Sequence, residues 1–296
     1  MYNSSLELIG NGPLILLKHI LEKYGFEGNL YAKYEGFNLT GSIKDKAVLM
    51  IIKDLEEKNL LRPGMTIVES TSGNTGISLA LIGHLLGYNV IIVMPENMSD
   101  DRKKLIRKYQ AKLILTIKEE GMKGAINKAK ELASDKNSLY FNQFYQQANI
   151  DTHIKMTAKE IDRDLQGKVD TIVCGIGSAG TIMGLAKYFK HQNPNIKIIG
   201  VEPASSPFIS DGVAGGHKIE GIGAGFYPPL LERLLIDEIA KVEDDEAIKA
   251  EKILLDEEGL FCGTSSGAAL MGAMRYKSRK NIVVILPDNG YRYLNN

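Results

Sequence analysis

The sequence predicts an α/β protein built from two open, twisted and mostly parallel sheets. Short β-branched runs alternate with amphipathic helical patterns almost from one end of the 296 residues to the other, which is typical of parallel sheets joined by crossover helices. Several runs, such as 91–93 and 282–285, are continuously apolar, as expected of strands that are covered on both faces. We therefore expect an N-terminal α/β domain at 1–147 and a C-terminal one at 148–296, with the first 35 or so residues able to pack on the second domain.

Local patterns predict the elements in chain order. Strands are expected at 30–34, 66–69, 90–94, 112–116, 171–174, 197–202 and 281–286. Among the helices between them, one carries an apolar stripe over 48–55 and ends before Pro63, and another is closed by Gly87, which favours a left-handed cap. A further helix is expected to begin after Ser99 as its N-cap. The irregular stretch 204–229 is rich in Gly, Ser and Pro, and a loop of that length is usually functional or mobile.

The composition excludes several classes of protein. Lys and Arg number 36, as do Asp and Glu, so neither a nucleic acid nor a membrane surface is expected as the main partner. Cys174 and Cys262 are too few for a zinc site or a disulfide framework, and the five His show no ligand spacing, so no metal is expected. The uncharged stretch 70–95 changes its period midway and contains four Gly, which argues against a membrane-spanning helix. With no leader visible, we expect a cytoplasmic protein.

Four glycine-rich turns lie where an expected strand gives way to a helix, which is the edge at which open α/β sheets bind ligands. The turn at 175–180 reads Gly-Ile-Gly-Ser-Ala-Gly and, with Glu202 ending the next strand, matches a dinucleotide-binding fingerprint. Its physical basis is less specific, because free N–H groups and the helix dipole bind any phosphate. The pattern alone predicts an anion cradle and leaves open whether the ligand is NAD or another phosphate.

The other three turns carry further candidate chemistry. The turn at 38–45 places Lys44 at the start of a helix, where the dipole disfavours a cation. This lysine is either a solvated side chain or an amine whose pKa is lowered by the dipole and burial, suited to Schiff-base chemistry. The turn at 70–76 offers backbone donors, hydroxyls and one amide, which suit a carboxylate or phosphate but also an ordinary N-cap. The turn at 262–267 only approximates a Gly-x-Ser-x-Gly elbow, so a hydrolase is not expected.

Taken together and in this order, the four turns resemble the cysteine synthase (O-acetylserine sulfhydrylase) family, with features shared by cystathionine β-synthases. The motifs that carry the resemblance are Asn-x-Thr-Gly-Ser-x-Lys-Asp at 38–45 and Thr-Ser-Gly-Asn-Thr-Gly at 71–76, and the similarity extends from Ile9 to Leu294. Enzymes of this family use pyridoxal 5′-phosphate. The resemblance implies a fold-type II, tryptophan synthase β-like architecture with the cofactor in the cleft between two domains, and it displaces the NAD interpretation.

The resemblance also implies roles for individual residues. Lys44 would hold the cofactor as an internal aldimine and act as general base and acid at Cα, Asn74 would hydrogen-bond the cofactor's 3′ oxygen, and Ser265 would face its pyridine nitrogen. The cofactor-binding residues implied are Lys44, Asn74, Gly177, Ser178, Ala179, Gly180, Thr181 and Ser265. The substrate-binding residues implied are Thr71, Ser72, Gly73, Thr75, Gln143, Gly221 and Ile222.

The implied reaction is β-replacement through an aminoacrylate intermediate, in which O-acetyl-L-serine and sulfide give L-cysteine and acetate. Leu39 stands where the family usually has proline, Ala179 where it has glycine and Tyr291 where it has glutamate, and Asp211 lies in a divergent loop at 204–218. These departures leave the β-substituent open. The alternatives are an enzyme that consumes L-cysteine and releases hydrogen sulfide (a desulfhydrase, or a lanthionine- or serine-forming enzyme) and a cystathionine β-synthase type.

The resemblance finally implies the partners. They are a small amino-acid substrate and sulfide or a thiol, a second copy of the chain in a homodimer, and the C-terminal tail of serine acetyltransferase in the active-site cleft. A protein that uses the fold only for binding, without turnover, is the alternative from another class, and Lys44 argues against it.

Overall fold

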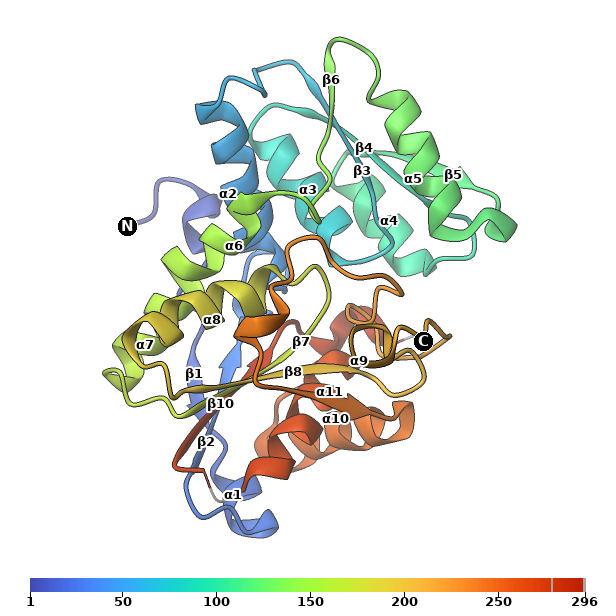
Figure 1. Ribbon diagram of the computed structural model, residues 1–296. Coiled ribbons are helices and arrows are strands. Elements are labelled where there is room, and N and C mark those ends of the chain that lie inside the picture. The colour runs from blue at the N-terminus through green and yellow to red at the C-terminus, as the bar shows by residue number, and fades with distance from the viewer. Residues whose placement is uncertain (278, 295–296) are drawn as a thin grey trace.

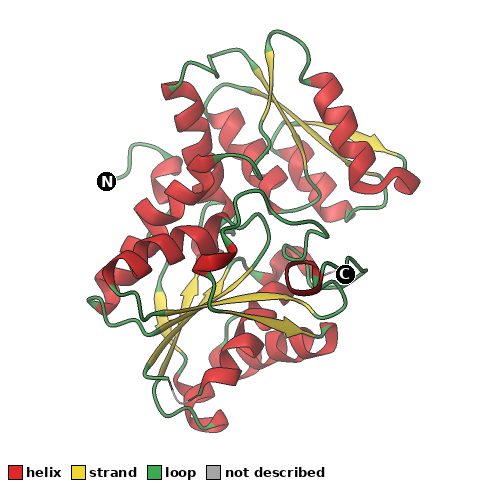
Figure 2. Cartoon of the chain, viewed as in Figure 1, coloured by secondary structure: helices red, strands yellow, loops and turns green. Residues whose placement is uncertain are grey.

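The computed structural model describes residues 1–277 and 279–294 and contains two sheets. A six-stranded sheet has the order β1-β2-β10-β7-β8-β9, and a four-stranded sheet has the order β5-β4-β3-β6. All pairings are parallel except that of β1 with β2. The prediction of two mostly parallel α/β sheets is confirmed, and Figures 1 and 2 show helices on both faces of each.

The strands and helices have the following bounds. The strands are β1 Leu14–Leu16, β2 Asn29–Tyr34, β3 Thr66–Ser70, β4 Asn89–Pro95, β5 Lys112–Thr116, β6 Ser138–Tyr140, β7 Thr171–Gly175, β8 Lys197–Pro203, β9 Glu238–Val242 and β10 Asn281–Leu286. The helices are α1 Lys18–Tyr24, α2 Lys44–Glu57, α3 Asn74–Leu85, α4 Asp100–Lys108, α5 Gly121–Leu132, α6 Gln147–His153, α7 Lys159–Leu165, α8 Gly180–Gln192, α9 Phe208–Asp211, α10 Asp244–Glu258 and α11 Thr264–Ala273. A π-helical turn, Ile154–Ala158, joins α6 to α7.

The seven expected strands are all present, and each observed boundary lies within one residue of the expected one. The sequence did not predict β1, β6 and β9. Two of these, β1 and β6, have only three residues, and β9 is an edge strand whose exposed positions carry charge. Such strands lack the long apolar run that marks a central parallel strand.

The alternation of side chains along each strand divides the core into layers. In β10, Ile282, Val284 and Leu286 pack into a cluster with α10 and α11, whereas Val283 and Ile285 pack into a cluster with α8. The four-stranded sheet is covered in the same way by two clusters, one with α2 and α3 and one with α5. Successive residues of a strand face opposite sides of the sheet, so strands covered on both faces are apolar throughout.

The start of the chain joins the sheet that its end completes. β2 pairs in parallel with β10 from Asn29 opposite Asn281 to Tyr34 opposite Leu286, and Figure 1 shows β1 and β2 beside β10. Residues 14–34 therefore belong to the six-stranded sheet, and residues 66–140 form the four-stranded one. The division of the chain into domains at 147/148 stays a prediction.

Two local expectations are modified by the structure. Ser99 occupies the N-cap position of α4, but its hydroxyl accepts no capping hydrogen bond. The irregular stretch 204–229 contains the short helix α9, whose Asp211 pairs with Lys241 at 3.1 Å on the surface. Both cysteines, Cys174 and Cys262, are free and buried. Among the helices that the structure describes, none is long and apolar enough to cross a membrane.

Candidate active site

One cavity of about 780 Å³ collects the turns that the sequence singled out. It is lined by residues that follow the carboxyl ends of β3, β6, β7 and β10, together with Lys44 at the start of α2 and the loop at 220–226. Every predicted cofactor- and substrate-binding residue lines it except Gly180. A side chain at Gly180 would collide with the Asn149 amide of α6, so this glycine serves close packing behind the cavity wall.

Lys44 is the first residue of α2 and presents its amine to the cavity. Burial lowers the pKa of this amine, and the negative charge of the neighbouring Asp288 opposes that shift only in part. Desolvation destabilises the ammonium form. At a given pH, Lys44 is therefore a neutral, nucleophilic amine in a larger fraction of molecules than a lysine in water would be. Burial also raises the pKa of Cys174 to about 12, which keeps this thiol protonated.

The turn between β3 and α3 forms an anion cradle on one side of Lys44. The α3 helix begins at Asn74, and no side chain caps its free N–H groups. Thr75 is buried, and its hydroxyl donates to Gln143 Oε1 at 2.8 Å. Thr71 and Ser72 line the same stretch of wall. Free N–H groups at a helix N-terminus, with hydroxyls and an amide beside them, suit a carboxylate.

The turn between β7 and α8 forms a second cradle. α8 begins at Gly180 without a side-chain cap, and the preceding Ala179 adopts the left-handed region at φ 68°. At Gly177 an added Cβ would lie 2.5 Å from the carbonyl oxygen of Gly221, so only glycine fits between the two loops. The hydroxyls of Ser178 and Thr181 add side-chain donors at the cavity wall. This arrangement fits a phosphate group.

Polar side chains behind the second cradle hold its hydroxyls in place. Asn149 Nδ2 donates to Ser178 Oγ at 3.0 Å, and His153 Nε2 lies 3.2 Å from Thr181 Oγ1. Burial, with help from the charges of Lys46 and Lys44, holds the pKa of His153 well below its usual range. The imidazole is therefore neutral at physiological pH.

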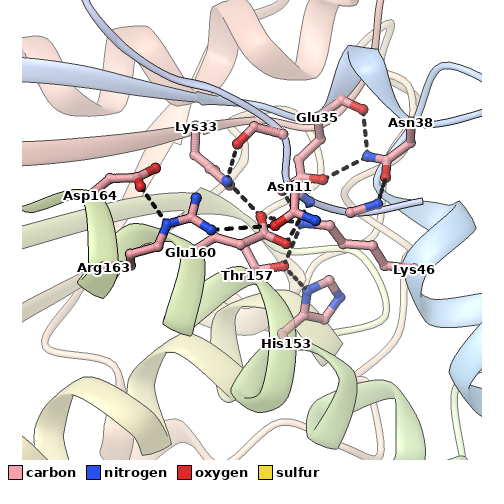
Figure 3. Close-up of polar contacts among 12 residues, drawn as sticks. Asn11, Lys33, Glu35, Asn38, Lys46, His153, Thr157, Glu160, Arg163 and Asp164 are labelled. Carbon is pink, nitrogen blue, oxygen red and sulfur yellow. Dashed lines mark hydrogen bonds and ion pairs between the residues drawn. The ribbon is translucent and has the colours of Figure 1, made fainter. Parts of the chain in front are cut away.

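A buried ionic cluster lies behind the lysine-bearing helix (Figure 3). Lys46 Nζ contacts Glu35 at 2.7 Å, Glu160 at 2.8 Å and Thr157 Oγ1 at 3.3 Å. Lys33 contacts the same Glu160 carboxylate at 2.6 Å. Two lysines thus balance two glutamates, and the cluster ties β2, α2 and α7 together. Lys46 is engaged on this side of α2 and does not line the cavity.

Sequence reasoning missed several residues that line the cavity. Asp288 is among them, although its place after β10 puts it at the ligand-binding edge. Glu69, at the carboxyl end of β3, is buried, and burial raises its pKa to about 8. Arg102 donates to the Ser72 carbonyl at 3.2 Å and pairs with Glu220. These contacts join the turn between β3 and α3 to the loop at 220–226. Only the position of Asp288 and Glu69 at strand ends gave a signal in the sequence.

The cavity fits pyridoxal phosphate on the evidence of its own donors. An amine of lowered pKa can bond to the aldehyde, and the uncapped N-terminus of α8 with Ser178 and Thr181 can hold the phosphate. Ser265, in the first turn of α11, supplies a hydroxyl to the same wall. The first cradle, at the N-terminus of α3, stays available for the carboxylate of an amino acid.

Comparison with known proteins gives a consistent result. Residues 6–288 match the family described as pyridoxal-phosphate dependent enzymes. A cysteine synthase of Staphylococcus aureus is 40% identical over 293 residues, which is 97% of this chain and 94% of that protein. The sequence resemblance is thereby confirmed.

Solved structures agree with the sequence match. The cysteine synthase of Entamoeba histolytica superposes with a TM-score of 0.96 at 37% identity and covers 100% of this chain and 90% of that one. A hydrogen sulfide-producing enzyme of Fusobacterium nucleatum gives a TM-score of 0.93 at 39% identity, with 99% of this chain and 98% of that one covered.

Proposed function

The chain belongs to the pyridoxal-phosphate dependent enzymes, and we propose that it catalyses cysteine synthesis of the β-replacement type. The substrates are O-acetyl-L-serine and sulfide, and the products are L-cysteine and acetate. One observation carries the proposal: the amine of Lys44 shares a single cavity with two anion cradles, one at the N-terminus of α3 and one at the N-terminus of α8. An amino-acid carboxylate and a cofactor phosphate are the two anions that this reaction requires.

The protein groups divide the work of the reaction. Ser178 and Thr181, with the N–H groups of the α8 N-terminus, would hold the phosphate, and Lys44 would hold the aldehyde carbon. Thr71 and Thr75 would bind the substrate carboxylate with the N–H groups of α3. When bound, pyridoxal phosphate supplies the electron sink that stabilises negative charge at Cα. Once a substrate is bound, the Lys44 amine would be placed to take the Cα proton as general base.

Ser265 sets how strongly negative charge at Cα is stabilised. Its hydroxyl, rather than a carboxylate, would face the ring nitrogen, and a hydroxyl does not hold that nitrogen protonated. A hydroxyl at this place would therefore favour expulsion of acetate from Cβ over transamination. Lys44 would return the proton to Cα once sulfide has added at Cβ.

Mixing the protein with its cofactor and substrates tests this proposal. Purified protein supplied with pyridoxal phosphate should become yellow, change its visible absorbance when O-acetyl-L-serine is added, and form L-cysteine when sulfide follows. The matched pair of variants is Lys44→Ala, which should lose cysteine formation, and Lys53→Ala, an exposed lysine of the same helix, which should retain it. A protein that stays colourless, or full activity in Lys44→Ala, would contradict the proposal.

A second candidate function runs the same chemistry on L-cysteine and releases hydrogen sulfide. It is favoured by the 39% identity to a hydrogen sulfide-producing enzyme over nearly the whole of both chains. Sulfide release from L-cysteine, measured beside cysteine formation from O-acetyl-L-serine under the same conditions, separates the two. Sulfide release should be slower than cysteine formation if the main proposal holds. It should be the faster of the two if the second candidate function holds.

The remaining expectations from the resemblance are carried forward as proposals. A homodimer is tested by light scattering of the eluted protein, and a cytoplasmic location by fractionation of the source cells. Binding of a serine acetyltransferase C-terminal tail would place its terminal carboxylate in the α3 cradle. Competition of a synthetic tail peptide with O-acetyl-L-serine tests that interaction.

A further inference from the structure

The segment after β10 lies directly against the turn that carries Lys44. The Ile43 N–H donates to the Pro287 carbonyl at 2.8 Å, and the Asn289 N–H donates to the Gly41 carbonyl at 3.1 Å. An isolated antiparallel bridge pairs Ser42 with Asp288 between these two bonds. The closing motif at 287–293, to which the proposed function assigns no role, is therefore part of the active-site frame.

Asp288 and Arg292 of this segment form hydrogen bonds to opposite ends of the Asn74 side-chain amide. Asn74 Nδ2 donates to Asp288 Oδ2 at 2.7 Å, and Arg292 Nη1 donates to Asn74 Oδ1. The second guanidinium nitrogen of Arg292 donates to the Thr40 carbonyl, and the Tyr293 hydroxyl donates to Asp288 Oδ2. Asp288 is 1% exposed and Arg292 7% exposed, so water competes little for these bonds.

The two partners leave the amide a single orientation. Arginine carries only donors, so it can meet only the oxygen of Asn74, and the Asp288 carboxylate accepts from the nitrogen. A flipped amide would set its NH₂ group against the guanidinium and its oxygen against the carboxylate, which loses two charge-assisted hydrogen bonds. The orientation is thus fixed by chemistry that lies outside Asn74 itself.

The fixed orientation decides what Asn74 offers to the cavity. Its NH₂ group has two hydrogens, and Asp288 takes one of them. Within residues 1–277 and 279–294 no second hydrogen-bond acceptor is found for this nitrogen, and Asn74 lines the same cavity as Lys44. The amide can therefore act there as a donor and not as an acceptor.

We propose that Asp288 and Arg292 are positioning residues, which lock Asn74 as a hydrogen-bond donor to the phenolic ring oxygen of the cofactor. This rests on pyridoxal phosphate being the cofactor of the proposed function. An amide free to turn would present donor and acceptor in alternation and would bind the negatively charged oxygen less well. A donor at that oxygen stabilises its ionised form, on which the long-wavelength absorbance of the bound cofactor depends.

Asp288 has a second effect that follows from its place. Its carboxylate lies near Lys44, since Asp288 bridges to Ser42, and it favours the ammonium form of that lysine. The free Oδ1 atom has no hydrogen-bond partner among the described residues and lies against Gly263 at the start of α11. Effects of Asp288 that pass through Asn74 must therefore be separated from effects on Lys44.

The test uses the holoenzyme and compares Asp288→Leu, which removes the acceptor at similar size, with Asn74→Ala and with the double variant. Asp288→Leu should lower the ratio of the long-wavelength band to the near-ultraviolet band and raise the Kd for pyridoxal phosphate by about 10-fold or more. The part of the Asp288 effect that passes through Asn74 should vanish in the Asn74→Ala background, so Asp288→Leu should change the Kd much less there than in the wild type. Tyr291→Phe, at an exposed position of the same segment, should match the wild type.

Arg292→Met is an independent second test, and it can be measured even if Asp288→Leu does not fold. It frees the oxygen end of the amide and should lower the same absorbance ratio, again without further effect in the Asn74→Ala background. Unchanged spectra in the two single variants, or effects that add fully to those of Asn74→Ala, would overturn the proposal. A wild-type protein that binds pyridoxal phosphate but makes no cysteine would contradict the proposed function and leave this spectral test in force.

Discussion

Replacing Lys46 by methionine should destabilise the protein far more than a surface charge deletion does. Lys46 is fully buried, and its amine contacts Glu35 and Glu160 at 2.7 and 2.8 Å. Without it, Glu160 keeps Lys33 at 2.6 Å, but among the described residues the buried Glu35 carboxylate keeps only the Asn38 amide at 2.7 Å. Removing one partner of a buried pair typically costs about 3–5 kcal/mol. At about 2–4 °C per kcal/mol, the midpoint of thermal unfolding should fall by roughly 10 °C.

A matched control separates burial from charge. Lys58 contacts Asp54 at 2.7 Å, the same distance, but its side chain is 55% exposed. Lys58→Met should leave the midpoint almost unchanged, because solvent screens the exposed pair. Both variants are measured by thermal unfolding, followed by circular dichroism at one protein concentration and without added cofactor.

A compensating variant tests the cause. Adding Glu35→Gln to Lys46→Met removes the unpaired carboxylate and should recover part of the lost stability, because the uncompensated charge is the main cost. A loss of stability in Lys46→Met no greater than that in Lys58→Met would show that the buried charge is not the cause. A Lys46→Met protein that becomes still less stable with Glu35→Gln would show the same.

Three further outcomes follow from single positions in the cavity wall. Gly177→Ala should weaken binding of pyridoxal phosphate, because its Cβ would lie 2.5 Å from the Gly221 carbonyl oxygen, whereas Gly216→Ala, with open space around it, should bind normally in the same titration. Ala179→Gly should stabilise the protein by about 1 kcal/mol in urea unfolding, because Ala179 adopts φ 68°, and an unchanged midpoint would contradict this. Burial raises the pKa of Glu69 from 4.5 to about 8, so the folded state holds a proton that the unfolded state has lost, and stability should fall as pH rises between these values by up to about 1.4 kcal/mol per pH unit. Glu69→Gln should flatten this part of the stability profile, and an equal slope in both proteins would rule out Glu69 as the cause.

The central strands could be predicted from sequence because the apolar run that marks each of them is contiguous in the chain. A strand covered on both faces must be apolar at every position, so 282–285 reads as a strand without knowledge of its neighbours. β9 could not be predicted in this way because it is an edge strand that pairs with β8 on one side, and its Glu238 and Lys241 face solvent. The three-residue β6 could not be predicted either, because its pairing with β3, rather than its own sequence, makes it a strand.

The candidate site divides in the same way. The glycine-rich turns could be predicted because each is a contiguous motif between a strand and a helix. The partners of Asn74 could not, because Asp288 and Arg292 lie more than 200 residues away in sequence, at separations of 214 and 218. The same holds for Lys46 and Glu160, which are 114 residues apart. Only the folded chain shows that these groups meet.

The measurement that bears most directly on the central claim is formation of L-cysteine by purified protein loaded with pyridoxal phosphate. O-acetyl-L-serine is added first, with the visible spectrum recorded, and sulfide second, with L-cysteine quantified. We expect a spectral change at the first addition, its reversal with stoichiometric cysteine at the second, and loss of both in Lys44→Ala but not in Lys53→Ala. Cysteine formation that persists in Lys44→Ala, or a loaded wild-type protein that shows neither change, would contradict it.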